Sequence, residues 1–145
     1  MHRVGLLRGA YVLADVDRFK VLNDTLGHAA GDAALLHVAA ILKHQLRGRD
    51  VAARIGGEEF VLWLPDVSYS EALSVAERVR DAIETSNWSW RGSPWLLTAS
   101  FGVAQWPDTS RHVDNLYAQA DASLYDAKRL GRNRVAGSRP ETIPR

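Results

Sequence analysis

The run Val51-Ala-Ala-Arg-Ile55-Gly-Gly-Glu-Glu-Phe60-Val-Leu-Trp-Leu64 holds two extended segments on either side of a glycine pair. Two glycines between such segments predict a tight β-hairpin, because both tolerate positive φ. Glycines without side chains would equally let a ligand lie against the backbone. The spacing alone does not separate these two explanations of Gly56 and Gly57.

A second apolar run, Ala10–Ala14, precedes the hairpin and ends in Asp15-Val16-Asp17. It predicts a buried strand that delivers acids to its end, with Asp15 and Asp17 pointing the same way. If this strand neighbours the hairpin, Asp15 and a glutamate at 58 or 59 could share a cation such as Mg²⁺. Taken singly, each acid is equally explained as solvated surface charge.

Helical periodicity accounts for most of the remaining chain. Residues 19–26 predict a short helix, and residues 32–46 a longer one with Asp32 as N-cap and Gly48 as its stop. Residues 68–85 predict a helix opened by a capping box, and residues 113–130 a last helix ended by Gly131. Residues 95–105 alternate as a half-buried strand, with a loop over 87–94 before it. This order predicts an α+β fold, with a mostly antiparallel sheet flanked by helices.

Composition limits the possible functions. The 145 residues fit one domain, with no cysteine and a formal charge of +1. The net charge is therefore too small to attract the chain to nucleic acid or a membrane surface. No apolar run reaches the length of a membrane span. The absence of cysteine excludes disulfides and permits a reducing cytoplasm.

Several blocks together resemble the GGDEF domain of the diguanylate cyclase family. Ile55–Phe60 resembles its signature, in the variant with Glu at the third position. The other matching blocks, in family order, are Asp15–Lys20, Asn23-Asp24, Gly27-His28, Gly31-Asp32, Ser100–Val103 and Ala120–Asn133. The resemblance implies a sheet related to the palm of nucleotidyl cyclases and polymerases.

The resemblance also implies a reaction. Two domains meet as a transient homodimer, and each 3′-hydroxyl of a bound GTP attacks the α-phosphate of the other. Cyclic di-GMP, a bacterial second messenger linked to biofilm formation, and two pyrophosphates are the products. The implied cofactor is Mg²⁺ or Mn²⁺, the implied location is the cytoplasm, and a sensor or receiver domain is implied in the full-length protein.

Site residues follow from the resemblance by motif position. Metal binding is expected of Asp15, the Val16 carbonyl, Glu58 and Glu59, and the two glutamates are also the expected catalytic residues. Substrate binding is expected of Lys20, Asn23, His28, Asp32, Gly56, Gly57, Lys128 and Arg132. Among these, Asn23 and Asp32 are expected to read guanine, and Lys128 and Arg132, one helical turn apart, to contact phosphate.

A further tetrapeptide, Arg47-Gly-Arg-Asp50, resembles the family's R-x-x-D inhibitory motif for the product. An arginine fork can bind phosphate, and an aspartate can accept guanine N–H groups. Arg78 is expected to assist from the next helix. The alternative for all three residues is a charged helix end and a solvated helix face.

One departure from the family pattern concerns the N-terminal region. The usual D-x-L-T-G-L-x-N-R-R segment is not found before Ala10, which bears on dimerisation and turnover. We expect a single domain over residues 1–137 and a flexible tail over 138–145. The leading hypothesis is an active cyclase; the alternative is an effector domain that binds GTP or cyclic di-GMP without turnover.

Overall fold

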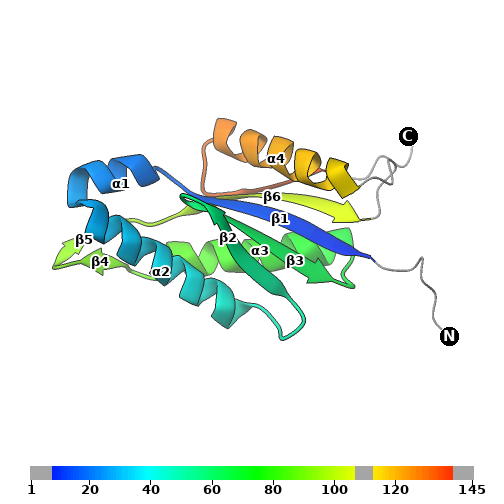
Figure 1. The fold of residues 1–145 in the computed structure, drawn as a ribbon, viewed down its shortest axis with the longest axis horizontal. Coiled ribbons are helices and arrows are strands. Elements are labelled where there is room, and N and C mark those ends of the chain that lie inside the picture. The colour runs from blue at the N-terminus through cyan, green and yellow to red at the C-terminus, as the bar shows by residue number, and fades with distance from the viewer. Residues whose placement is uncertain (1–7, 107–112, 139–145) are drawn as a thin grey trace.

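A computed structural model describes residues 8–106 and 113–138 of the chain. A five-stranded sheet in the order β2-β3-β1-β6-β7 forms its centre (Figure 1). Its strands are β1 (Gly9–Val16), β2 (Val51–Gly56), β3 (Glu59–Pro65), β6 (Ala99–Trp106) and β7 (Val135–Ser138). Every pairing is antiparallel except that of β6 with β7.

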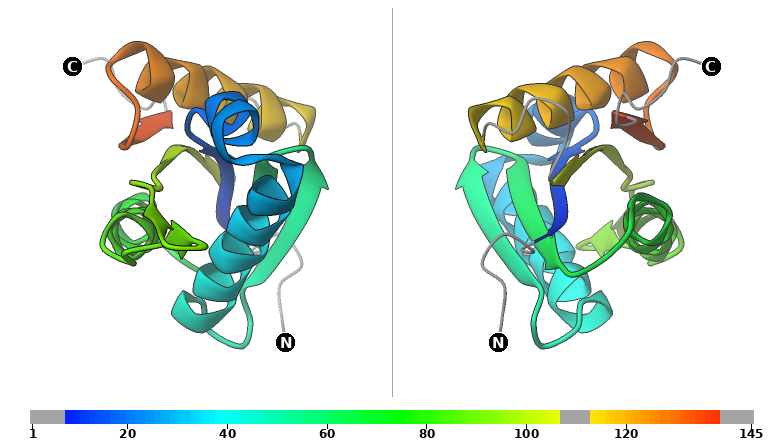
Figure 2. Two further views of the ribbon diagram at one scale, coloured as in Figure 1. Left: turned by 90° about the vertical axis from the view of Figure 1, so that its left-hand side faces the viewer. Right: turned by 90° about the vertical axis from the view of Figure 1, so that its right-hand side faces the viewer.

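Helices cover both faces of this sheet. They are α1 (Phe19–Leu26), α2 (His28–Gln45), α3 (Tyr69–Glu84) and α4 (Val113–Arg129). The end-on views show α4 over one face, with α2 and α3 on the opposite side (Figure 2). The predicted α+β class with a mostly antiparallel sheet is therefore confirmed.

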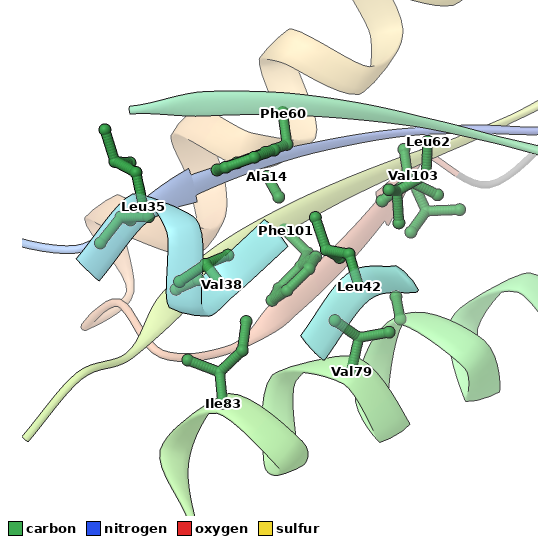
Figure 3. Packing of buried hydrophobic residues seen from close by; sticks show 14 of the residues in the cluster. Ala14, Leu35, Val38, Leu42, Phe60, Leu62, Val79, Ile83, Phe101 and Val103 are labelled. Atoms are coloured by element: carbon green, nitrogen blue, oxygen red, sulfur yellow. The ribbon is translucent and has the colours of Figure 1, made fainter. Parts of the chain in front are cut away.

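The alternation of side chains along β1 assigns its residues to two cores. Val12 and Ala14 join the larger core beneath α2 and α3, where Phe101 and Leu42 are fully buried (Figure 3). Leu13 joins the smaller core beneath α4. Since side chains alternate between the faces, Asp15 shares the α4 face with Leu13.

Of the two N-caps predicted from the sequence, one is correct and one is wrong. The capping box of α3 is present, with Ser68 and Glu71 bonded reciprocally. The prediction of Asp32 as N-cap of α2 is wrong, because the helix begins four residues earlier, after Gly27 at φ 99°. Asp32 is therefore an exposed helical residue and is free of a capping role.

Two strand predictions also need correction. The last long strand starts at Ala99 instead of residue 95, and the expected loop over 87–94 contains a small ladder of β4 (Ser89–Trp90) with β5 (Ser93–Pro94). Strand β7 continues as far as Ser138, the first residue of the expected flexible tail. The rest of the expected tail, 139–145, lies outside the described residues. No helix within the described ranges is long and apolar enough to cross a membrane.

Candidate functional site

Three acidic residues gather where β1 ends and β3 begins. Asp15 is the register partner of Glu59 across the β1–β3 ladder. The Val16 amide donates to the Glu58 carbonyl at 3.1 Å, so Glu58 lies beside the end of β1. The structure thus brings together all four residues that the resemblance assigned to metal binding.

The Asp15 carboxyl group has an unusual environment. Its side chain is only 6% exposed, and Lys128 Nζ of α4 donates to Oδ2 at 2.8 Å. Burial raises its pKa to about 6, against the opposing effect of Lys128, and the charges of Glu58 and Glu59 raise it further. Burial therefore outweighs the favourable effect of Lys128 on the carboxylate, and repulsion from Glu58 and Glu59 adds a smaller effect in the same direction as burial.

This set of oxygens suits a divalent cation. Within the described residues, no three His, Cys, Asp or Glu side chains are close enough to enclose a metal by themselves. Mg²⁺ commonly takes one or two carboxylates and completes its shell with water and substrate phosphates. Asp15, Glu58, Glu59 and the Val16 carbonyl fit that pattern of partial coordination.

The glycines of the hairpin are not where the sequence predicted the turn. Gly56 pairs with Glu59, so the two turn residues are Gly57 and Glu58, and the register shifts between Arg54 and Gly56. Neither Gly56 nor Gly57 has φ in the left-handed region, so the positive-φ explanation is wrong. A Cβ at either position would meet no atom within 4 Å. Nothing in the folded chain therefore requires glycine at these two positions.

The α1–α2 elbow holds the two residues expected to read guanine. Asn23 lies on α1, and its Oδ1 is buried without a hydrogen-bond partner in the described chain. A Cβ on Gly31 would collide with this atom, so the glycine lets the Asn23 amide fit closely against α2. Asp32, the next residue, is exposed beside this contact.

A groove of about 820 Å³ runs between α2 and the hairpin. Its walls are largely apolar and include Leu35, Leu36, Ala39, Leu42, Ala52, Ala53 and Phe60. Asp32 lines one part, whereas Arg47 and Asp50 line another. At a helical rise of 1.5 Å per residue, Asp32 and the end of α2 at Gln45 are about 20 Å apart. Of the predicted substrate residues, Asp32 alone is in the lining of this groove, at a separate position from Arg47 and Asp50.

The expected phosphate ligands are not placed as the sequence predicted. Lys128 lies in the last turn of α4, but Arg132 follows the helix in a turn at φ 64°. Its amide donates to the Ala127 carbonyl at 2.9 Å, and that of Gly131 to Lys128 at 3.3 Å, the bond pattern of a Schellman motif. The expected helical spacing of Lys128 and Arg132 is therefore wrong, because Gly131 ends the helix between them.

Two other substrate predictions lie at the periphery of this arrangement. Lys20 is 87% exposed and donates to Asp24 on the same helix at 3.1 Å. His28 is the exposed first residue of α2. The structure brings neither side chain into the lining of the groove, so their roles stay predictions.

The R-x-x-D segment forms a compact turn after α2. Asp50, with a side chain 1% exposed, accepts the Arg47 amide at 2.8 Å, and its Oδ1 lies 3.5 Å from Arg47 Nη2. Arg78 instead donates to the side chain and carbonyl of Gln45, which caps the end of α2. The structure thus gives Arg78 a local role that the sequence did not indicate.

Sequence reasoning also missed polar residues around the site. Arg54 lines the groove and its Nε donates to the Gly57 carbonyl at 2.9 Å, which ties the turn to β2. The position of Arg54, two residues before the glycine pair, was the sequence feature that could have indicated this contact with the turn. Asp17, predicted to point the same way as Asp15, accepts hydrogen bonds from Thr98, from Ser100 of β6 and from the Asn133 amide in the turn after α4.

These features define a palm-like α+β domain with an acid cluster beside a ligand-sized groove. Residues 6–134 match the family model described as diguanylate cyclase, GGDEF domain. The chain belongs to the GGDEF family.

Among curated relatives, diguanylate cyclase A of Treponema denticola is 42% identical over 128 residues, which are 88% of this chain and 34% of that protein. Diguanylate cyclase DgcP of Pseudomonas aeruginosa is 40% identical over 136 residues, 92% of this chain and 20% of the relative. The chain therefore spans about a third or less of these two relatives.

Solved structures show the same fold. The GGDEF domain of DgcB from Caulobacter crescentus, in complex with c-di-GMP, superposes with a TM-score of 0.87 at 31% identity, covering 92% of this chain and 80% of that one. The active GGEEF domain of a diguanylate cyclase from Vibrio cholerae gives a TM-score of 0.84 at 28% identity, with coverages of 91% and 83%.

Proposed function

We propose that this domain condenses two GTP molecules into cyclic di-GMP. The observation that carries the proposal is the bare glycine pair. Gly56 and Gly57 adjoin the acid cluster, yet neither φ nor crowding inside the chain calls for glycine there. The remaining reason is the close approach of a ligand to the backbone, and a nucleotide lying across the hairpin would supply it.

The chemistry assigns one GTP to each of two domains. The 3′-oxygen of one nucleotide forms a bond to the α-phosphorus of the other, the α–β phosphoanhydride breaks, and pyrophosphate leaves with the electron pair. A second such step closes the ring. Because the nucleotides must face each other, two domains form a transient homodimer. The reaction takes place in the cytoplasm, where its substrate GTP is available.

The chain's own residues bind and orient the substrate. Asn23 and Asp32 at the α1–α2 elbow offer amide and carboxylate oxygens to the N–H edge of guanine. Lys128 and Arg132 supply positive charge for the phosphates. Glu58, next to Gly57 in the turn, would accept the proton of the 3′-hydroxyl.

Asp15, Glu58, Glu59 and the Val16 carbonyl would hold Mg²⁺ or Mn²⁺. When bound, such an ion polarises phosphate oxygens and offsets developing negative charge. Burial, and to a smaller extent repulsion from Glu58 and Glu59, raises the pKa of Asp15, and this supports the role because a bound cation would favour the ionised carboxylate.

The far part of the groove supports a product-inhibition site at Arg47 and Asp50. Arg47 is 57% exposed at its side chain, so its guanidinium can turn to a phosphate at little cost. The about 20 Å of helix between Asp32 and this turn leaves room for separate ligands.

Incubation with GTP and Mg²⁺, followed by chromatography of the nucleotides, tests the proposal. Cyclic di-GMP should form with a steep dependence on protein concentration. Glu58→Gln should lower turnover at least about a hundredfold, the scale of losing a general base, and should leave the melting temperature unchanged. Asp126→Asn, on the exposed side of α4, is the matched carboxylate control.

The alternative is an effector domain that binds GTP or cyclic di-GMP without turnover. Unreacted GTP at high protein concentration, together with binding of either nucleotide by calorimetry, would replace the cyclase proposal with this one. Intact acids at 58 and 59 favour the cyclase.

A further inference from the structure

A buried carboxyl group next to the acid cluster has no cationic partner among the described residues. The Asp17 residue is 6% exposed and forms no ion pair in the described part of the chain. It accepts hydrogen bonds from Thr98 Oγ1 at 2.7 Å, Ser100 Oγ at 2.6 Å and the Asn133 amide at 3.0 Å. Three neutral donors therefore satisfy this buried carboxyl group, and one of them comes from a distant turn.

That turn has a backbone conformation that side chains disfavour. Gly131, Arg132 and Asn133 have φ of 128°, 64° and 48° in succession. Glycine tolerates this region and asparagine does so partly, but arginine rarely adopts it. Such strain persists only where the surroundings hold the chain in place, and it concentrates at functional sites.

The surroundings hold this turn from three sides. Asp17 and Ser100 both accept the Asn133 amide, at 3.0 and 3.1 Å. Arg80 of α3, itself bonded to Glu77 and Glu84, donates to Asn133 Oδ1 at 2.9 Å. The Phe101 amide of β6 donates to the Arg134 carbonyl at 2.9 Å.

The turn is fixed beside the acid cluster. It follows directly from the helix end that carries Lys128, whose Nζ bonds Asp15 at 2.8 Å. Arg132 occupies its middle and is bonded through its backbone amide and carbonyl, whereas its guanidinium makes no hydrogen bond or ion pair with the described residues. A strained arginine held at the backbone and left without a partner at its side chain is prepared for an anionic ligand.

We propose that Asp17 is a positioning residue that holds Arg132 in its left-handed conformation, so that the guanidinium meets a phosphate of bound GTP. Asp17 acts through the Asn133 amide and does not itself touch the nucleotide, and Arg80 supports the same turn from α3. This inference rests on the proposed binding of GTP.

A double-mutant cycle on nucleotide binding tests the inference. The ligand is 3′-deoxy-GTP with Mg²⁺, which lacks the attacking hydroxyl, and the readout is the dissociation constant from calorimetry. Arg132→Ala should weaken binding about tenfold or more, the scale of a lost charge-assisted bond. Asp17→Ala should weaken it by a similar factor in the wild-type background and less than about twofold in the Arg132→Ala background.

A second readout does not depend on the nucleotide. Hydrogen exchange at the Asn133 amide should accelerate at least about tenfold in Asp17→Ala, because this amide loses its carboxylate acceptor. Asp17→Asn keeps an amide oxygen for the same donors, so its effects should be intermediate; it also replaces the alanine variant if that one does not fold. Asp126→Ala, an exposed carboxylate on α4, should change neither readout.

The possible outcomes distinguish the positioning role of Asp17 from the proposed cyclase activity. Effects of Asp17→Ala that are equally large with and without Arg132, or unchanged exchange at Asn133, would overturn the inference. A wild-type protein that binds the nucleotide but makes no cyclic di-GMP would defeat the cyclase proposal alone, and the cycle would still be decisive. A wild-type protein that binds no nucleotide would end both.

Discussion

Replacing Gly57 by alanine should separate stability from function. A Cβ at this position meets no atom within 4 Å, and its φ lies outside the left-handed region. Alanine at a compatible position stabilises a protein by about 0.4–1 kcal/mol, chiefly by restricting the unfolded chain. For a chain of this size, that corresponds to a rise in melting temperature of roughly 1–4 °C.

The same methyl group should impair catalysis severely. If the nucleotide lies against the Gly57 backbone, a Cβ displaces it by about 1 Å, and misplacement on that scale costs about a hundredfold in rate. The assay is cyclic di-GMP formation at saturating Mg²⁺, with the melting temperature measured on the same preparation. Gly56→Ala should behave in the same way.

Gly102→Ala is the opposite control. A Cβ on Gly102 would collide with the Ala120 carbonyl and the Leu124 amide of α4, so this variant should lose stability by at least about 1–3 kcal/mol. Full activity in Gly57→Ala would refute the ligand explanation of the glycine pair. A large loss of stability in that variant would instead show that the chain itself requires the glycine.

Two further predictions concern regulation and pH. Arg47→Ala should raise the cyclic di-GMP concentration needed for half-inhibition about tenfold or more, the loss of a charge-assisted phosphate contact, while the Michaelis constant for GTP stays within twofold; unchanged inhibition would remove the second site. Burial lowers the pKa of His37, whose Nε2 lies 2.9 Å from Ser86 Oγ. Because the unfolded chain takes up that proton first, this contribution to stability should be complete above pH 6.5 and decline as the pH falls through the lowered pKa. Thermal melts at several pH values should show a flatter decline in His37→Gln, and identical slopes would contradict the assignment.

The sequence by itself determined the features that depend on short-range periodicity and motif order. Two extended runs around a glycine pair predicted the hairpin, although its turn residues are Gly57 and Glu58, and apolar stripes predicted the four helices to within a few residues. The capping box at Ser68 could be predicted from the sequence because its two hydrogen bonds join residues three apart. The family resemblance also predicted that Asp15 and Glu58 lie close together, as they do in the structure.

Only the tertiary structure decided which partner each polar side chain takes. Asp17 and Asp15 are equivalent along a strand, but the first bonds Asn133 and the second Lys128, each more than 100 residues away in the chain. The short strand β7 depends on the ladder of β6, so four residues carried too little local signal to predict it. Likewise, only the tertiary structure shows that a Cβ at Gly57 would meet no atom within 4 Å of the folded chain. Local sequence patterns reflect the preference of the backbone for helix, strand or turn. Burial, strain and the space around a residue depend on how segments distant in the sequence pack together, which local patterns do not specify.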